Sequence, residues 1–294
     1  MSSATPRVVV IGDALIDELR ADGEVTDHVG GAALNVAVGL ARLGHRAQLV
    51  CMLGDDADGE RIRAYLDDHG VEVVASPSER GTARAISERI DGEPTYAFND
   101  AARFRDIRFD AAQRAAIADA EVVIVSCFRF DDDAQFARMR DAIDAGTSRL
   151  VVDANPRAGM LHAAEAFIRN LESLLPRTEL LKLGDDDAHL LWNDDLDAVV
   201  SGIRSRSDVT VMVTRGADGA GIRGAGDDVD VPIAHSGVPI IDTMGAGDSV
   251  VAATVHRLLA GEESWPSILA FAMRVAEATC AHEGALLQTP DSDV

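Results

Sequence analysis

Lysine is almost absent from this chain, and its scarcity is part of a general shortage of positive charge. Lys182 is the only lysine, and the 27 basic residues are outnumbered by 50 aspartates and glutamates. The net charge of -23 argues against a nucleic-acid partner, because a phosphate backbone needs a basic surface. The single lysine is either a chance survivor or a cation that one site requires.

Cysteines and long apolar runs are also scarce. The three cysteines, Cys51, Cys127 and Cys280, are far apart and lie in apolar surroundings, which fits buried free thiols better than disulfides or a zinc site. No stretch approaches the roughly 20 apolar residues that span a bilayer, and residues 1–7 do not resemble an export signal. We therefore expect a cytoplasmic protein with no membrane partner.

Apolar strands alternate with amphipathic helices along most of the 294 residues. This alternation predicts a doubly wound α/β fold with a mostly parallel sheet. The expected strands are residues 8–11, 47–53, 122–127, 150–153, 179–183 and 209–214. A hairpin pattern at residues 82–106 interrupts the alternation, and with part of residues 17–29 it predicts a small β lid on one domain that spans residues 1–294.

A glycine-rich turn near the C-terminus is the strongest site signal. Residues 238–241 have the pattern of a strand end, Gly245 and Gly247 permit a tight turn around Ala246, and residues 250–259 have helical spacing. A turn that opens a helix directs free N–H groups and the positive end of the helix dipole at one point, which suits an anion. Asp248 is then either a helix cap or a base that takes a proton from a hydroxyl.

Two further stretches in the N-terminal part are candidate small-molecule contacts. Asp17 follows the strand at residues 8–11, where ligands of open α/β sheets bind; a turn aspartate is the alternative. Gly30 and Gly31 open a helix and allow a ligand to approach the backbone, and Asn35 offers both a donor and an acceptor. Paired glycines at a helix start are also common without a function.

Polar residues after later strands extend the candidate set. Asn155 and Arg157 follow the strand at residues 150–153 and suit phosphate contacts, or they belong to an ordinary polar loop. Carboxylates at residues 185–187 suit Mg²⁺ held through water, or the first turn of a helix. A tight turn follows the strand at residues 209–214. The acidic cluster at residues 54–59 lacks the spacing of a calcium loop and is interpreted as a surface turn.

The glycines from Gly219 to Gly224 match a dinucleotide fingerprint by letters alone. No helix pattern follows them and they do not lie in a first βα turn, so we reject that interpretation. The chain has no Gly-Lys-Ser/Thr sequence and hence no P-loop.

Together these motifs resemble the ribokinase/PfkB family of sugar kinases, from residue 8 to about residue 285. The specific segments are residues 30–37 with the following Leu43-Gly44, and residues 242–248. The resemblance implies a ribokinase-like three-layer α/β/α sandwich with a small β lid, and transfer of phosphate from ATP with Mg²⁺ to a primary sugar hydroxyl. Residues 153–157 and 182–187 are more similar to the fructokinase and 2-keto-3-deoxygluconate kinase branch.

The resemblance also implies roles for the candidate residues. Asp248 becomes the base, with Gly245, Ala246 and Gly247 as the anion hole. The implied sugar contacts are Asp17, Gly31 and Asn35, and Gly216 and Gly219 lie beside the nucleotide. We further predict that Gly30 contacts the sugar and that Arg157 meets the transferred phosphate. The other predicted nucleotide contacts are Asn155, Lys182, Asp187 and Thr214, and Asp187 is also predicted to hold magnesium through water.

Some positions depart from the family pattern, and some questions stay open. Gly184 replaces a usual Asn or Ser, Asp187 a usual Glu, Met273 a usual Asn and Val250 a common aromatic residue. A fructokinase-like activity is the main hypothesis, and 2-keto-3-deoxygluconate, ribose or a nucleoside are alternative acceptors. A non-catalytic sugar-binding regulator is the alternative from another class. Activation by K⁺ is left open, and a dimer through the lid is expected. The lid residues proposed for acceptor choice are Arg84, Tyr96, Phe98 and Arg103.

Overall fold

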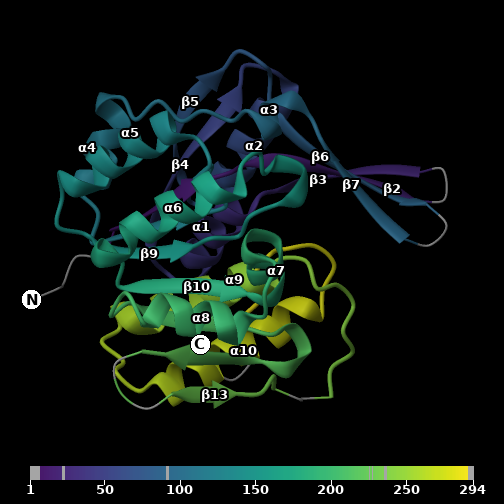
Figure 1. Cartoon of the computed structure of the whole chain (residues 1–294). Helices are drawn as coiled ribbons and strands as arrows, with labels where there is room; N and C mark the ends of the chain where they lie inside the picture. Colours follow the sequence, from purple (N-terminus) through teal and green to yellow (C-terminus); the bar gives the residue numbers. More distant parts are fainter. Residues whose placement is uncertain are drawn as a thin grey trace, which may run out of the picture.

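A large sheet runs through the centre of the molecule (Figure 1). The computed structural model describes residues 7–21, 24–90, 93–224, 226, 228–234 and 237–290. Within these ranges the sheet has nine strands in the order β13-β12-β11-β10-β9-β8-β1-β4-β5. Neighbours from β11 to β5 are parallel, whereas β12 and β13 pair antiparallel at one edge.

The strands of the large sheet are β1 (Arg7–Gly12), β4 (Arg46–Gly54), β5 (Glu72–Ser78), β8 (Val122–Ser126), β9 (Arg149–Asp153), β10 (Leu180–Gly184), β11 (Thr210–Thr214), β12 (Ala220–Arg223) and β13 (Val229–Val231). The central strands are buried on both faces and read as continuous apolar runs, as parallel strands do. Because the strands are parallel, the loops after β1, β8, β9, β10 and β11 all emerge at one edge.

Helices cover both faces of this sheet. One face carries α1 (Ala32–Arg42), α2 (Ala57–Asp68), α9 (Ala246–Leu259) and α10 (Trp265–Cys280). The other carries α4 (Ala111–Ala118), α5 (Asp133–Asp144), α6 (Ala164–Leu174), α7 (Asp185–Trp192) and α8 (Leu196–Arg204). Along β1 the side chains alternate between the two cores: Val8 and Val10 pack on the first face, and Val9 and Ile11 on the second. The predicted three-layer sandwich is confirmed.

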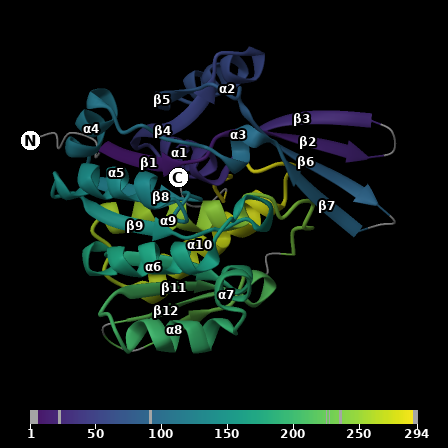
Figure 2. The ribbon, with the colours of Figure 1, turned by 45° about the horizontal axis from the view of Figure 1, so that its top comes forward.

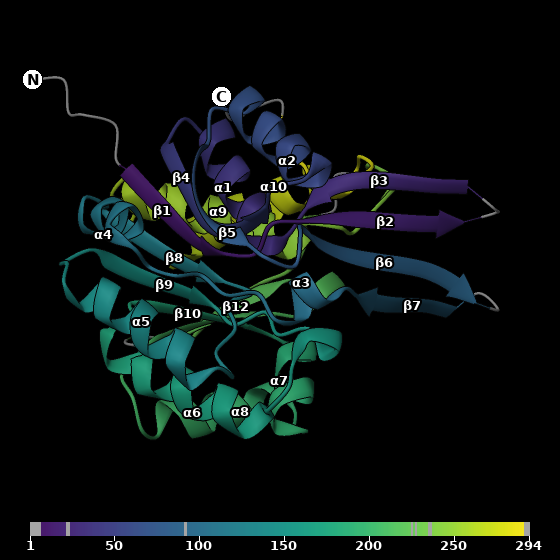
Figure 3. The ribbon, with the colours of Figure 1, turned by 90° about the horizontal axis from the view of Figure 1, so that it is seen from above.

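Four further strands form a second sheet that projects from one side of the molecule (Figures 2 and 3). They are β2 (Leu15–Ala21), β3 (Glu24–Gly30), β6 (Ala83–Ile90) and β7 (Glu93–Phe98), in the order β3-β2-β6-β7. We call this the small sheet. Residues 19–21 and 24–28, which are mostly polar in sequence, form regular strands here because β2 and β3 pair along their whole length. The short helix α3 (Asp100–Arg103) follows β7, and the expected turn at Asp91–Gly92 lies outside the described residues.

The expected strand before the glycine-rich turn is wrong. Residues 238–241 form no strand, and Val238, Ile240 and Ile241 are about half exposed. The N–H groups of Ile241 and Asp242 both donate to the carbonyl of Cys280 at the end of α10, at 2.8 and 3.1 Å. These apolar residues therefore form a loop that is hydrogen-bonded to the end of α10, and not a strand that is hydrogen-bonded to a neighbouring strand.

The remaining elements are three short 3₁₀ turns: η1 (Ala158–Met160), η2 (Leu175–Arg177) and η3 (Gly216–Asp218). The three cysteines are buried and unpaired, as predicted. None of the helices in the described ranges has both the length and the apolar character needed to cross a membrane.

Candidate active site

A cleft of about 1170 Å³ lies at the edge of the large sheet where the parallel strands end, and the small sheet forms part of its wall. Most of the residues singled out in the sequence line it, although they come from distant parts of the chain. These are Asp17, Gly31, Asn35, Asn155, Arg157, Lys182, Asp187, Thr214, Gly216, Gly219, Gly245, Ala246, Gly247 and Asp248. The structure thus brings together the candidate base, anion turn, sugar contacts and nucleotide contacts.

The glycine-rich turn forms the first part of α9. Gly245 is the N-cap residue with φ of 75°, and a Cβ there would lie 2.7 Å from Cα of Ala285, so only glycine fits. The first intrahelical bond runs from the N–H of Ser249 to the carbonyl of Gly245, at 2.8 Å. Within the described ranges nothing accepts the N–H groups of Gly247 and Asp248, which leaves two donors at the positive end of the helix for an anion.

Asp248 is 8% exposed and does not cap its own helix. Its Oδ2 accepts a hydrogen bond of 2.8 Å from Nδ2 of Asn35 in α1. Burial raises the pKa of Asp248 to about 6, against the opposing effect of the Asn35 hydrogen bond. The carboxylate is therefore mainly ionised at pH 7 and is a stronger base than an exposed aspartate.

Asp17 lies within β2 rather than after the end of a strand. Its carboxylate crosses the space left open by Gly30, where a Cβ would come within 2.2 Å of Oδ2. Burial and the neighbouring Asp13 raise the pKa of Asp17 to about 7, and Arg157 partly offsets them. Gly30 itself does not line the cleft. Because Gly30 has no side chain, it leaves room for the Asp17 carboxylate. This role differs from the direct contact with the sugar that was expected for Gly30.

Asp13 is a residue of this site that the sequence motifs did not indicate. It follows β1 and lines the cleft. Its Oδ1 accepts the N–H of Ala33 at 3.0 Å, and its carbonyl accepts the N–H of Leu34 at 3.2 Å. Asp13 therefore caps α1 from outside, because the N-cap residue Gly31 has no side chain for that task. The only sequence feature that could have indicated Asp13 is its position as an acidic residue directly after a buried strand.

Lys182 lies buried beneath the glycine-rich turn, on β10. Its Nζ is 3.0 Å from Oδ1 of Asp153 and 3.7 Å from Oδ2 of Asp187. Burial alone would lower the pKa of Lys182, but the two carboxylates raise it overall, so the ammonium stays charged. The Nζ atom is also 3.9 Å from the position of a Cβ on Gly247. This geometry makes Lys182 a fixed positive charge at the anion turn, paired mainly with protein groups.

Asp187 is held in place at the start of α7. Its Oδ2 accepts the N–H of Gly184 at 2.8 Å, and burial raises its pKa in spite of Lys182. Asp185 and Asp186 line the cleft beside it. The described residues contain no cluster that would ligate a metal directly through three side chains. Carboxylates at a cleft wall do fit Mg²⁺ held through water, which is its usual mode of binding.

The proposed acceptor-choice residues of the small sheet have different surroundings. Phe98 lines the cleft, and its ring approaches within 2.5 Å of where a Cβ on Gly159 would lie. Arg103 lies at α3, beside Asp100 and Phe104, and does not line the cleft. Arg84 is engaged with carboxylates, as described below. The side chain of Tyr96 lies outside the described part of the structure.

The fold and the cleft define an α/β protein that presents a helix N-terminus, a buried carboxylate and a buried cation around one anion site. Residues 5–292 match the pfkB family of carbohydrate kinases. The chain belongs to this family, as the sequence motifs predicted, and it is a carbohydrate kinase.

Individual relatives can be aligned with nearly the whole chain. The 2-dehydro-3-deoxygalactonokinase of Haloferax volcanii is 28% identical, covering 98% of this chain and 95% of the relative. Fructokinase-1 of Oryza sativa subsp. japonica is 26% identical, covering 99% and 96%. A structure of fructokinase with bound ATP from Xylella fastidiosa superposes with a TM-score of 0.80 at 25% identity, covering 95% and 94%. These similarities confirm the ribokinase-like fold.

Proposed function

We propose that this chain transfers the γ-phosphoryl group of ATP to a primary sugar hydroxyl, with Asp248 as the base. One observation supports this above the others: the Asp248 carboxylate is buried in the first turn of α9, beside N–H groups that have no acceptor among the residues described in the structure. A hydroxyl that reaches this carboxylate also lies next to the anion site. Proton removal by a positioned base contributes roughly 10²–10⁴ in rate.

The charges around the turn suit phosphoryl transfer, in which the protein mainly positions the reactants and stabilises charge. The donors at Gly247 and Asp248 would bind oxygens of the transferred group, and a donor of this kind is worth roughly 10²–10³ in kcat. Arg157 lines the same cleft, and Lys182 adds a fixed positive charge beneath it. The anion would therefore be matched by backbone dipoles and two cations.

The nucleotide would lie between the glycine-rich turn and the loop that contains Thr214, Gly216 and Gly219. Both line the cleft, and the Xylella fastidiosa fructokinase structure contains ATP. Asp187 would hold Mg²⁺ through water, and bound Mg²⁺ neutralises charge on the phosphates. Asp187 itself is oriented by the N–H of Gly184 and by Lys182.

For the acceptor we propose a neutral sugar first, as in a fructokinase. Asp13, Asp17 and Asn35 line the acceptor end of the cleft, and they offer two carboxylates and an amide to hydroxyl groups. An ionised carboxylate at this end opposes an anionic acceptor unless a cation balances it. Fructokinases among the relatives are consistent with this choice.

Arg157 favours one second candidate, a 2-keto-3-deoxy sugar acid. Its positive charge acts on both Asp17 and Asp248, so it lies where an acceptor carboxylate could pair with it. The Haloferax volcanii relative is named as a kinase for such an acid. Arg84 and Arg103 are paired with other carboxylates, so they do not supply a further cation to the acceptor.

The test is ATP- and Mg²⁺-dependent ADP release against fructose, ribose, 2-keto-3-deoxygluconate, 2-keto-3-deoxygalactonate and adenosine. A ketose with the highest kcat/KM supports the neutral-sugar proposal, and preference for either acid supports the second candidate. Sugar binding without turnover on any acceptor would contradict both and favour a non-catalytic regulator. Repeating the best reaction in KCl and in NaCl tests the open K⁺ requirement.

The dimer through the small sheet stays a prediction. In the part of the chain that the structure describes, β3 and β7 are the edge strands of the small sheet, so each could pair with a strand of a second copy. Val25 on β3 is 63% exposed. Sedimentation at micromolar concentration should show a dimer, and a monomer would contradict the prediction.

A further inference from the structure

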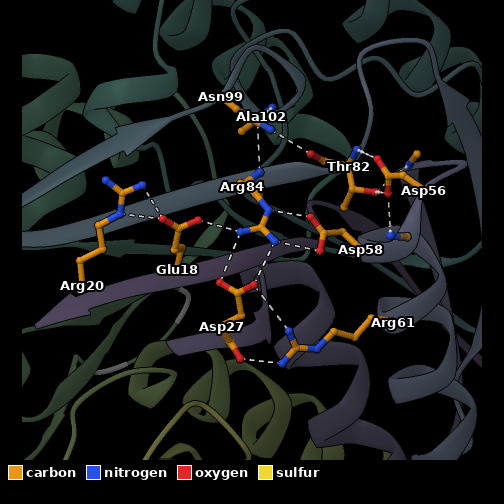
Figure 4. Close-up of polar contacts among 12 residues, drawn as sticks. Glu18, Arg20, Asp27, Asp56, Asp58, Arg61, Thr82, Arg84, Asn99 and Ala102 are labelled. Atoms are coloured by element: carbon orange, nitrogen blue, oxygen red, sulfur yellow. Dashed lines mark hydrogen bonds and ion pairs between the residues drawn. The ribbon is translucent and has the colours of Figure 1, made fainter. Parts of the chain in front are cut away.

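Arg84 uses its whole guanidinium group to bind three carboxylates (Figure 4). Nε and Nη2 bind Asp58 of α2 at 2.6 and 2.9 Å. Nη2 and Nη1 bind Asp27 of β3 at 2.9 and 3.3 Å, and Nη1 binds Glu18 of β2 at 2.7 Å. These five bonds match the five N–H donors of an arginine. One side chain on β6 thus joins two neighbouring strands of the small sheet to a helix of the main body.

The carboxylates would repel one another without this arginine. Glu18 and Asp27 are direct cross-strand partners in the β2–β3 register, and like charges in that position destabilise a sheet. Asp58 brings a third negative charge from α2. Arg20 and Arg61 bind the outer side of the group, at Glu18 Oε1 and the Asp27 carbonyl. The Arg84 side chain is only 26% exposed, so water screens its contacts less than those of a surface pair.

A second set of bonds anchors the root of β6 to the same helix. Asp56 caps α2 through the N–H of Gly59 at 2.9 Å and also accepts the N–H and hydroxyl of Thr82, at 2.8 and 2.6 Å. Asn99 accepts the N–H of Arg84 at 3.0 Å and donates to the Thr82 carbonyl at 2.9 Å. The acidic cluster at residues 54–59, expected to be a plain surface turn, is therefore the junction between the small sheet and the main body.

This junction has a direct connection to the cleft. Strands β2 and β6 pair in parallel with Asp17 opposite Ala85, and both residues line the cleft. Because side chains alternate along a strand, Arg84 lies on the opposite face of the small sheet, toward α2. The way in which the sheet sits on α2 therefore sets where Asp17 lies relative to Asp248.

We propose that Arg84 is a positioning residue for acceptor binding, which fastens the small sheet to α2 and so holds Asp17 at its place in the cleft. The inference rests on the proposed function in one respect, namely that Asp17 contacts the acceptor. It predicts that loss of the Arg84 contacts weakens acceptor binding and leaves nucleotide binding intact, because the glycine-rich turn and α7 belong to the main body.

The test compares Arg84→Met with Arg206→Met at one fixed ionic strength. Arg206 makes a 2.7 Å ion pair with Glu172 of α6, and neither residue lines the cleft. In Arg84→Met we expect the acceptor KM to rise about tenfold, with the ATP KM within twofold and kcat within threefold of wild type. Hydrogen exchange should quicken in β2 and β6 and stay unchanged in β8 and β9. The control should match wild type in all of these.

Arg84→Lys sharpens the comparison, because it keeps the charge but offers three donors from a single point. We expect it to recover only part of the acceptor KM. If Arg84→Met does not fold, Asp58→Asn provides the same test by removing one charged partner while Arg84 keeps the other two.

A folded Arg84→Met with the acceptor KM and hydrogen exchange of wild type would overturn the proposal. So would a loss confined to kcat with uniformly faster exchange, since this indicates general destabilisation. If the wild-type chain turns over no acceptor, the proposed function fails, and the exchange in β2 and β6 still decides whether Arg84 fastens the small sheet.

Discussion

Replacing Asn35 by leucine should move the acid limb of the pH-rate profile to higher pH. Asn35 donates a 2.8 Å hydrogen bond to the Asp248 carboxylate, and this bond holds the pKa of Asp248 below the value that burial alone would give. A hydrogen bond to a charged group is worth about 1.5–3 kcal/mol, and one pKa unit corresponds to about 1.36 kcal/mol. Because the cleft admits water, we expect the lower end, a shift of about one unit.

The assay is kcat/KM for the best acceptor between pH 5 and 9 at constant ionic strength, which reports groups of the free enzyme. The pKa of Asp248 is about 6 in the wild type. A base must be deprotonated, so activity falls as the pH drops through that value, and in Asn35→Leu the midpoint of the fall should lie near pH 7. The overall level should also drop, because Asn35 is a proposed sugar contact.

Asp17 is the control for this experiment, because its pKa of about 7 falls in the same range. In Asp17→Asn the limb should persist, since Asp248 is untouched. An acid limb that does not move in Asn35→Leu, or moves to lower pH, would refute the reasoning. A limb that disappears in Asp17→Asn would show that Asp17 controls it.

Three further predictions concern stability. Burial, followed by Asp13, raises the folded-state pKa of Asp17 from 3.8 to about 7, so the loss of stability builds up between these two pH values and is complete above pH 7. Asp17→Asn should therefore unfold at higher urea than wild type at pH 8, and the difference in urea should shrink as the pH falls from 7 towards 4. A gap that grows on acidification would contradict this sign. Lys182→Met leaves Asp153 and Asp187 buried without their cation and should lower the free energy of unfolding by about 3–5 kcal/mol in denaturant titration; a loss under 1 kcal/mol would mean that water replaces the ammonium. The net charge of -23 destabilises the folded chain through repulsion between like charges, and salt screens this repulsion because the Debye length shortens from about 10 to about 3 Å between 0.1 and 1 M KCl. The melting temperature should therefore rise over this range, and a melting temperature that stays constant or falls would contradict the prediction.

Most of the features that could be predicted from the sequence depend on local patterns. The alternation of strands and helices and the helix opened by Gly245 and Gly247 depend on neighbouring residues, and they appear at the expected positions. The grouping of Asn155, Asp187 and Thr214 in one cleft follows from strand ends meeting at one edge of a parallel sheet, whereas neither Asn35 in α1 nor Asp248 in α9 directly follows a strand of that sheet. Their direct hydrogen bond spans 213 positions and has no local signature.

The sequence could not predict contacts that depend on long-range packing. Lys182 lines the cleft and stays a predicted nucleotide contact, but its ion-pair partner Asp153 lies on the neighbouring strand, and only strand order brings the two together. Arg84 looks like an acceptor contact, yet the β2–β3 register and the position of α2 supply its partners. The apolar residues 238–241 looked like a strand, but they are not part of either sheet in the described structure, and Ile241 donates to the carbonyl of Cys280 at the end of α10.

The most direct test of the central claim is γ-phosphoryl transfer by Asp248→Asn, measured beside wild type and Asp186→Asn with the best acceptor. Asp186 also lines the cleft, at the start of α7, and the proposed mechanism gives it no contact with the acceptor hydroxyl. The account predicts that kcat falls by two or more decades in Asp248→Asn, while the change in Asp186→Asn stays within tenfold. Wild-type turnover in Asp248→Asn would show that another group is the base and would contradict the account.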